Sequence, residues 1–247
     1  SPKIVLLTVT DSAIEPLCRE LAGRGAFARG SIVAHCCGAL SSEVLRPARE
    51  LCGCAVASMH PLQTFPTARA AVDAMPGTYF FIEGDRAALG PLEKLARAIG
   101  GRPCRIGGTP RQKALYHAAG CMASNYLVAL ADAVLAVAKE AGIGEKAAWP
   151  AMLPLVEATL RNITALGPAG ALTGPIARGD AQTVARHLDA LARVRAAGKK
   201  GLDKLYRAMG QWTVGLALRK GGIGRRIARE LETILEKKEI LDGREDH

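Results

Sequence analysis

Aromatic residues are scarce in this chain of 247 residues, where Phe, Trp and Tyr together make up 4% of the sequence. Surfaces that bind single-stranded nucleic acid stack the bases on aromatic rings, so this composition does not favour such a surface. The sequence also has no apolar run of the roughly 18–20 residues that a membrane-spanning helix needs. Its start lacks the basic, apolar and small-residue segments of an export signal. We therefore expect a cytoplasmic protein that does not contact a membrane.

The cysteines lack the spacing of a metal site. Cys36 and Cys37 are adjacent, and Cys52 and Cys54 are separated by a single residue. Zinc sites usually place two to four residues between such ligands. An odd total of seven cysteines without an export signal is typical of reduced thiols. We therefore expect these side chains to pack in the core, and we predict no metal site.

The net charge of +10 is the one hint of a nucleic-acid partner. About half of the positive excess falls after residue 194, where acidic and basic side chains are mixed. Mixed signs are typical of a solvated helix face. We do not expect nucleic acid as a partner, and the opposite hypothesis predicts an association that weakens steeply with salt.

The first hundred residues alternate short β-branched runs with helical patterns. Strands are predicted at 3–9, 31–36, 54–59, 78–83 and 103–106, and helices at about 12–21, 40–51 and 87–99. This alternation predicts a parallel sheet with crossover helices. Functional groups in such folds gather at the carboxyl ends of the strands, which here are residues 8–11, 36–38 and 60–63.

Strand patterns end at residues 107–110, and Ala- and Leu-rich helical patterns follow. Helices are predicted at about 111–141, 145–166, 179–196, 199–219 and 222–239, with Gly and Pro between them. The predicted organisation is an α/β domain over residues 1–108, followed by an all-helical domain over residues 109–247.

A glycine-rich phosphate turn is missing from the expected place. Dinucleotide-binding domains begin with a strand, a G-x-G-x-x-G turn and a helix whose N-terminus holds the pyrophosphate. No such turn precedes Thr8. The run Gly221-Gly222-Ile223-Gly224 follows a helical pattern instead, so we interpret it as a helix break.

His60 is the first candidate for chemistry. It follows a predicted strand and precedes Pro61, which favours an extended backbone at residue 60. An imidazole at this edge is suited to exchanging a proton near neutral pH. The alternative is a histidine that only forms hydrogen bonds within its loop.

A polar stripe runs along the helix predicted at 111–141. Lys113, His117, Gly120 and Ser124 are spaced four, three and four residues apart, which places them on one face, with Asn125 at its edge. The stripe predicts a site facing this helix, and the alternatives are a polar seam between helices or a solvated helix face.

Residues 171–180 form a segment broken by Gly and Pro. Thr173 and Gly174 offer a hydroxyl and a backbone N–H to an anionic ligand, with Arg178 nearby. The alternative is a turn in which Asp180 caps the next helix.

At residues 6–14, 60–65, 113–119, 123–127 and 171–180 the sequence resembles a family of bacterial Rossmann-like proteins with a C-terminal helical domain of unknown function, the domain of unknown function 2520. The resemblance extends over about residues 3–210. That family is similar to β-hydroxyacid dehydrogenases, pyrroline-carboxylate reductases and prephenate dehydrogenases. The resemblance implies an α/β fold with an incomplete Rossmann-like parallel sheet. It also implies hydride transfer with NADP or NAD to or from a small-molecule substrate, and a homodimer formed through the helical domain.

The resemblance also implies roles for individual residues. His60-Pro61 resembles the His-Pro of prephenate dehydrogenases, and Lys113 resembles the helix lysine of β-hydroxyacid dehydrogenases. Those enzymes have an asparagine four residues after the lysine, where this chain has His117. The cofactor-binding residues that the resemblance implies are Thr8, Thr10, Asp11, Cys36 and Gly38. Combined with the polar stripe and the segment 171–180, it leads us to predict the catalytic residues His60, Lys113 and His117 and the substrate-binding residues Ser124, Asn125 and Thr173.

Two hypotheses of function follow. The first is an NAD(P)-dependent oxidoreductase, with NADP preferred, that acts on a small hydroxy-acid, keto-acid or imine. The second is a non-catalytic helical dimer, a scaffold or sensor with a degenerate cofactor domain. It follows from the expectation that the chain lacks the family's Gly-rich N-terminal part.

Overall fold

The computed structural model describes residues 3–196 and 201–236. The chain divides into two compact units, residues 1–128 and 129–247, which we call the sheet unit and the helical unit. Helix α5 (Pro110–Ala123) lies within the sheet unit. The domain boundary at 108/109 stays a prediction based on composition.

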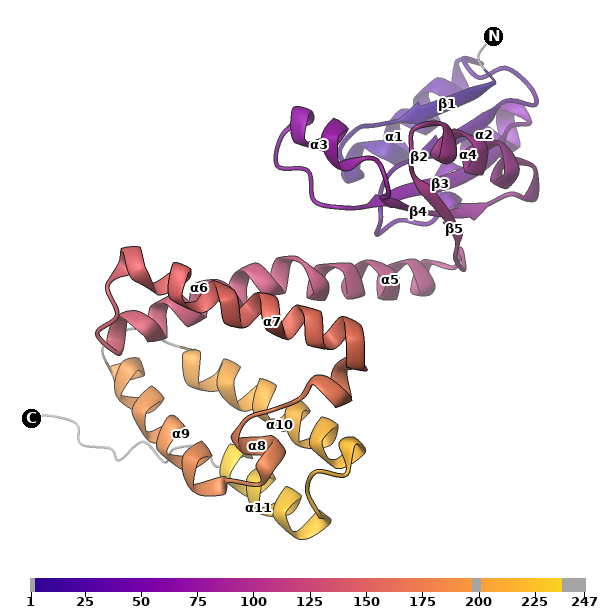
Figure 1. The fold of residues 1–247 in the computed structure, drawn as a ribbon. Helices are drawn as coiled ribbons and strands as arrows, with labels where there is room; N and C mark the ends of the chain where they lie inside the picture. The colour runs from indigo at the N-terminus through magenta and orange to yellow at the C-terminus, as the bar shows by residue number, and fades with distance from the viewer. Residues whose placement is uncertain (1–2, 197–200, 237–247) are drawn as a thin grey trace, which may run out of the picture. The chain divides into compact units, whose positions relative to one another are not determined.

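The sheet unit contains the five predicted strands, in the order β1-β2-β3-β4-β5 (Figure 1). Their bounds are Ile4–Leu7, Ile32–His35, Ala55–Leu62, Tyr79–Gly84 and Arg102–Arg105. A Rossmann-like α/β fold followed by helices is therefore confirmed.

The prediction of an entirely parallel sheet was wrong at one position. β4 runs antiparallel to β3, with Leu62 opposite Tyr79, while the other neighbouring strands are parallel. A parallel connection needs a crossover helix packed on the sheet. The helix between these strands, α3 (Ala68–Ala74), buries none of its residues, so it covers no face and the chain turns back along β3.

Alternating side chains of the strands build two cores. On one face Val33 and Val56 pack with α1 (Asp11–Gly23), with the short 3-10 helix η1 (Ser42–Leu45) and with α2 (Arg46–Cys52). On the other face Ala34, Ala57 and Ile82 pack against α4 (Arg86–Ala98). Because the side chains of a strand alternate, neighbouring residues of β3 serve different cores.

The helix predicted at 111–141 is interrupted. α5 begins with a capping box formed by Thr109 and Gln112 and ends before Ser124, where φ is −122° and ψ is −73°. α6 then covers Asn125–Glu140.

By length and composition, the stretch Pro110–Glu140 is the one candidate membrane span among the described residues, which corrects the expectation that no such run exists. Only 6% of its most apolar window is buried.

The helical unit continues with α7 (Glu145–Ala171), which breaks at Gly167 with φ of 69°. The helices α8 (Pro175–Arg178), α9 (Ala181–Ala196), α10 (Leu202–Lys220) and α11 (Arg225–Glu236) follow (Figure 1). Val184, Leu188, Val214, Leu231 and Leu235 form the centre of its core. The predicted helix ends at residues 199 and 239 lie outside the described residues.

Candidate functional site

Lys113 is fully buried in the first turns of α5, with 0% of its surface exposed. Its Nζ donates hydrogen bonds to Ser58 Oγ at 3.0 Å and to the Cys37 carbonyl at 3.4 Å. Nζ also lies 5.5 Å from the centre of the Tyr116 ring, within the range of a cation–π contact. One side chain of α5 is thus bonded to β3 and to the turn that follows β2.

A buried carboxylate balances this ammonium group. Glu83 on β4 is 3% exposed and accepts hydrogen bonds from the backbone N–H and the hydroxyl of Ser42, both at 2.8 Å. Burial lowers the pKa of Lys113, and the charge of Glu83 opposes that shift. Burial raises the pKa of Glu83, opposed by Ser42 and then by Lys113. The two groups therefore favour each other's charged forms inside the protein.

The pairing of β3 with β4 explains how these side chains meet. Ser58 lies opposite Glu83, and His60 lies opposite Phe81. Residues two apart on a strand share a face, so these four side chains form one patch of the sheet. It is the face opposite to Ala57 and Ile82, which pack against α4.

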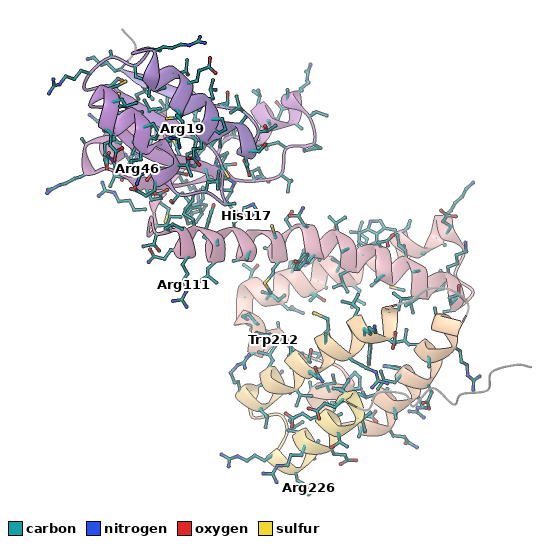
Figure 2. The ribbon with its side chains drawn as sticks, turned by 180° about the vertical axis from the view of Figure 1, so that it is seen from behind. Arg19, Arg46, Arg111, His117, Trp212 and Arg226 are labelled. Carbon is teal, nitrogen blue, oxygen red and sulfur yellow. The ribbon has the colours of Figure 1, made fainter. Side chains whose placement is uncertain are left out.

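His60 lies in this patch, half-buried, against two rings of α5. Its Nδ1 is 2.7 Å from the Tyr116 hydroxyl. The centres of the His60 and His117 rings are 6.4 Å apart, and the Tyr116 ring lies 4.7 Å from that of Phe81. Figure 2 shows His117 on α5, the helix that also bears Lys113. Three residues of the predicted site, His60, Lys113 and His117, are therefore brought together.

Both members of the His60–Tyr116 pair are neutral at pH 7. Burial, followed by the charge of Lys113, lowers the pKa of His60 from 6.5 to about 4, while Asp11 opposes the shift. Burial raises the pKa of Tyr116. The pair therefore offers hydrogen bonds without carrying charge.

Gly38 brings the turn after β2 against both histidines. A Cβ at this position would lie 2.8 Å from His60 Nε2 and 2.9 Å from His117 Cδ2. Real Cβ contacts are not that short, so a larger residue here would displace an imidazole.

The same turn is held from within by His35, which is fully buried. The Cys37 backbone N–H donates to His35 Nδ1 at 3.1 Å, and His35 Nε2 lies 3.3 Å from the Ser41 carbonyl. Because Nδ1 accepts, the ring proton is assigned to Nε2. Burial lowers the pKa of His35 to about 4.

The residues implied for the cofactor lie around this turn and the neighbouring β1–α1 turn. Thr8, Thr10 and Asp11 are exposed, and the backbone of Thr10 caps α1 without a hydrogen bond from its side chain. Cys36 is half-buried, and burial raises the pKa of its thiol. Burial followed by a hydrogen bond to Asp11 raises the pKa of Cys37, which links the two turns.

Two of the three residues predicted to bind the substrate, Ser124 and Asn125, form none of the hydrogen bonds or ring contacts that the described residues make in this cluster, and the third, Thr173, belongs to the helical unit. Ser124 is half-buried at the end of α5, and Asn125 is exposed at the start of α6. Thr173 is exposed in the helical unit, before α8. Nearby, Asp180 Oδ1 accepts the Thr183 N–H at 2.9 Å at the start of α9, as the capping interpretation of this segment predicts. The binding roles of Ser124, Asn125 and Thr173 stay predictions.

The described residues fit one half of a dinucleotide better than the other. The β1–α1 turn carries the exposed Thr8 and Thr10, whose hydroxyls can form hydrogen bonds with a ribose, and residue 38 is a glycine without a side chain. Between residues 3 and 196 no strand is followed by a G-x-G-x-x-G turn. Gly221 ends α10 in a left-handed conformation with φ of 74°, so that glycine run is a helix break.

Sequence reasoning missed Tyr116, Ser58 and Glu83. Tyr116 lies three residues after Lys113 and so belongs to the same stripe of α5. Ser58 shares a strand face with His60. Nothing in the sequence indicated Glu83, because its position depends on the antiparallel pairing of β4. Across residues 3–196 and 201–236, no group of three His, Cys, Asp or Glu side chains is close enough to hold a metal ion.

Comparison with known families and structures agrees with this architecture. Residues 78–213, more than half of the chain, match the family described as Domain of unknown function (DUF2520), and residues 1–61 match the Rossmann-like domain. The chain belongs to the DUF2520 family. No match was found among curated proteins.

Solved structures share the fold of this family member. Protein TM1727 from Thermotoga maritima is 27% identical, with 89% of this chain and 80% of that chain covered and a TM-score of 0.69. BF3122 from Bacteroides fragilis, a candidate NADP oxidoreductase, is 22% identical, with 83% and 74% covered and a TM-score of 0.61. A reductive aminase from Aspergillus terreus, in complex with NADPH and ethyl levulinate, is 14% identical, with 95% and 72% covered and a TM-score of 0.55.

Proposed function

We propose that this protein is an NAD(P)-dependent oxidoreductase that transfers a hydride between the nicotinamide and a small hydroxy-acid, keto-acid or imine. The observation that carries the proposal is the cluster around Gly38. Two imidazoles and a buried ammonium group meet there, at the carboxyl end of β2. Ligands of open α/β sheets bind at this edge. The two relatives described as NADP oxidoreductase and NADPH-bound reductive aminase support NADP over NAD.

The bound nicotinamide would supply or accept the hydride. Reduction of a carbonyl also requires a proton at its oxygen, and His60 or His117 is the group that we assign to this proton exchange. Lys113 is the residue that we assign to binding or protonating the substrate oxygen or nitrogen. Since its Nζ is bonded to Ser58 and to the Cys37 carbonyl, it would exchange one of these acceptors for the substrate atom.

The remaining predicted residues complete the proposal. Thr8, Thr10, Asp11, Cys36 and Gly38 would line the ribose and nicotinamide. Ser124, Asn125 and Thr173 would position the substrate.

We further propose a homodimer formed through the helical unit, in a cytoplasmic protein. α6 buries only Ala138, although its sequence is largely apolar. A groove of about 900 Å³ in the same unit is lined by α6, α9 and α10, including Val134, Val137 and Met209. Trp212 on α10 is 74% exposed (Figure 2). Apolar surface on this scale favours association with a second copy.

One observation favours the alternative, a non-catalytic scaffold or sensor. Lys113 is fully buried and its Nζ already donates to Ser58 and to the Cys37 carbonyl, as expected of a residue with a purely structural role. Nucleotide binding separates the two candidates, because a scaffold needs none.

NADPH and NADH titration by fluorescence and calorimetry tests the proposal. We expect both nucleotides to bind, NADPH more tightly. Gly38→Ala should weaken binding, because the added Cβ displaces an imidazole. Gly23→Ala, where an added Cβ meets nothing within 4 Å, is the matched control. Absence of binding of both nucleotides would overturn the oxidoreductase proposal in favour of the scaffold.

A further inference from the structure

His60 presents two different nitrogen atoms to its surroundings. Nδ1 lies 2.7 Å from the Tyr116 hydroxyl, so this edge of the ring is against α5. Nε2 faces position 38, where a Cβ would lie 2.8 Å from it. In a neutral imidazole one nitrogen donates and the other accepts. The location of the single proton therefore decides what His60 offers beside Gly38.

The contacts of Tyr116 indicate where that proton lies. Burial raises the pKa of the phenol, which keeps its hydrogen at neutral pH. Among the hydrogen bonds of the described residues, His60 Nδ1 is the one partner of this hydroxyl. Tyr116 is half-buried, and an O–H that is partly withdrawn from water without an acceptor is costly, so the phenol donates to Nδ1. The ring proton of His60 is then on Nε2.

The groups that face His60 favour the neutral ring. Lys113 and His117 face it from α5, His35 from β2 and Asp11 from α1. Burial and the Lys113 charge disfavour the imidazolium form, and Asp11 is the group that opposes them. A neutral Nε2–H is a hydrogen-bond donor and a very weak acid. Such an N–H group can polarise an acceptor atom through a hydrogen bond without transferring its proton, as a neutral histidine does in triosephosphate isomerase.

We propose that Tyr116 is a positioning residue that holds His60 as the Nε2–H tautomer, so that His60 donates a hydrogen bond to a substrate carbonyl oxygen beside Gly38. This inference rests on the proposed oxidoreductase function and narrows its substrate class. A carbonyl oxygen has lone pairs that accept such a bond. A protonated imine nitrogen has none, so the geometry favours keto compounds over iminium ions. Proton exchange is left to His117 or to Lys113.

The tautomer of His60 is measurable without nucleotide or substrate. Long-range ¹H–¹⁵N NMR of the full chain labelled with ¹⁵N-histidine reports which ring nitrogen is protonated, and His60→Gln identifies the His60 signals. We expect the Nε2–H tautomer in the wild type at neutral pH. Tyr116→Phe keeps the ring that contacts Phe81 and removes the donor, so the tautomer ratio should fall about fivefold, the equivalent of one ordinary hydrogen bond.

The chain offers a matched control. Tyr206 is 2.8 Å from His187 Nδ1 in the helical unit. Tyr206→Phe should change the His187 signals and leave those of His60 in place. An Nδ1–H tautomer of His60 in the wild type, or an unchanged ratio in Tyr116→Phe, would overturn the inference. If His60 has the expected tautomer but the chain binds neither NADPH nor NADH, the proposed function is wrong. The positioning of His60 by Tyr116 is then still supported.

Discussion

The sheet unit and the helical unit each contain a histidine bonded through Nδ1 to a tyrosine hydroxyl. The distances are 2.7 Å for His60–Tyr116 and 2.8 Å for His187–Tyr206, and the ring planes cross at 83° and 90°. The surroundings differ. His60 is half-buried beside a fully buried lysine, while His187 is exposed on a helix that borders an apolar groove.

This comparison separates the effect of the His–Tyr hydrogen bond from the effect of its surroundings. Burial and the nearby ammonium group lower the pKa of His60 to about 4 and keep the ring neutral. Gly38 leaves Nε2 of that ring beside the strand end where ligands of such sheets bind. In the helical unit the same hydrogen bond joins Tyr206 to a histidine that is exposed.

Acid should affect the sheet unit most strongly. His35 has a pKa of about 4 in the folded state and of 6.5 when unfolded, so the unfolded chain takes up the proton first. Stability should be unaffected by His35 above pH 6.5 and should fall as the pH drops towards 4, by about 3 kcal/mol. His60 acts in the same direction, and the raised pKa of Glu83 acts in the opposite one.

Urea unfolding of the wild type and of His35→Gln at pH 7 and pH 4 measures this effect. The variant should lose less stability between the two pH values, because it lacks one titrating group. Equal losses in both proteins would remove His35 from the explanation.

Removal of the Ser42 hydroxyl should have the next largest effect. Ser42→Ala takes one of two donors from a buried carboxylate, which typically costs about 1.5–3 kcal/mol. Ser12, an exposed serine of α1, is the control, and Ser12→Ala should stay within about 0.5 kcal/mol. Urea unfolding at pH 7 distinguishes the two. A small loss in both variants would show that Glu83 is easily solvated.

Lys113→Met tests the electrostatic part of the comparison. Loss of the ammonium charge should raise the pKa of His60. The rise should be less than half of the way from about 4 back to 6.5, because burial is the larger cause of the shift. NMR titration of the His60 signals measures it, and the His187 signals should not respond. A pKa that stays at about 4 would mean that burial alone keeps His60 neutral.

The smallest effect is expected from the two tyrosines. Tyr116→Phe should reduce stability by about 1 kcal/mol, the worth of one partly buried hydrogen bond. Tyr206→Phe should cost less than about 0.5 kcal/mol, because its partner His187 is exposed. Thermal and urea unfolding of both variants checks the order. A larger loss in Tyr206→Phe would contradict the distinction between the two pairs.

Much of the fold could be predicted from local pattern. β-Branched runs located the five strands to within a few residues, since buried strands need such side chains. The stripe of Lys113, His117 and Gly120 predicted the face of α5 that is turned inward, because helical spacing alone determines it. The break at Ser124 was missed, since a helical pattern rich in Ala and Leu continues on both sides of it.

The alternation of strands and helices, and the alignment of a lysine and a histidine on one helix, were determined by the sequence alone, since both depend on residues a few positions apart. The tertiary structure decided the rest. Lys113 meets Ser58 and Cys37 across 55 and 76 residues of chain, and Glu83 joins them only because β4 runs antiparallel to β3. The burial that keeps His60 neutral arises from the same long-range packing, which no local pattern encodes.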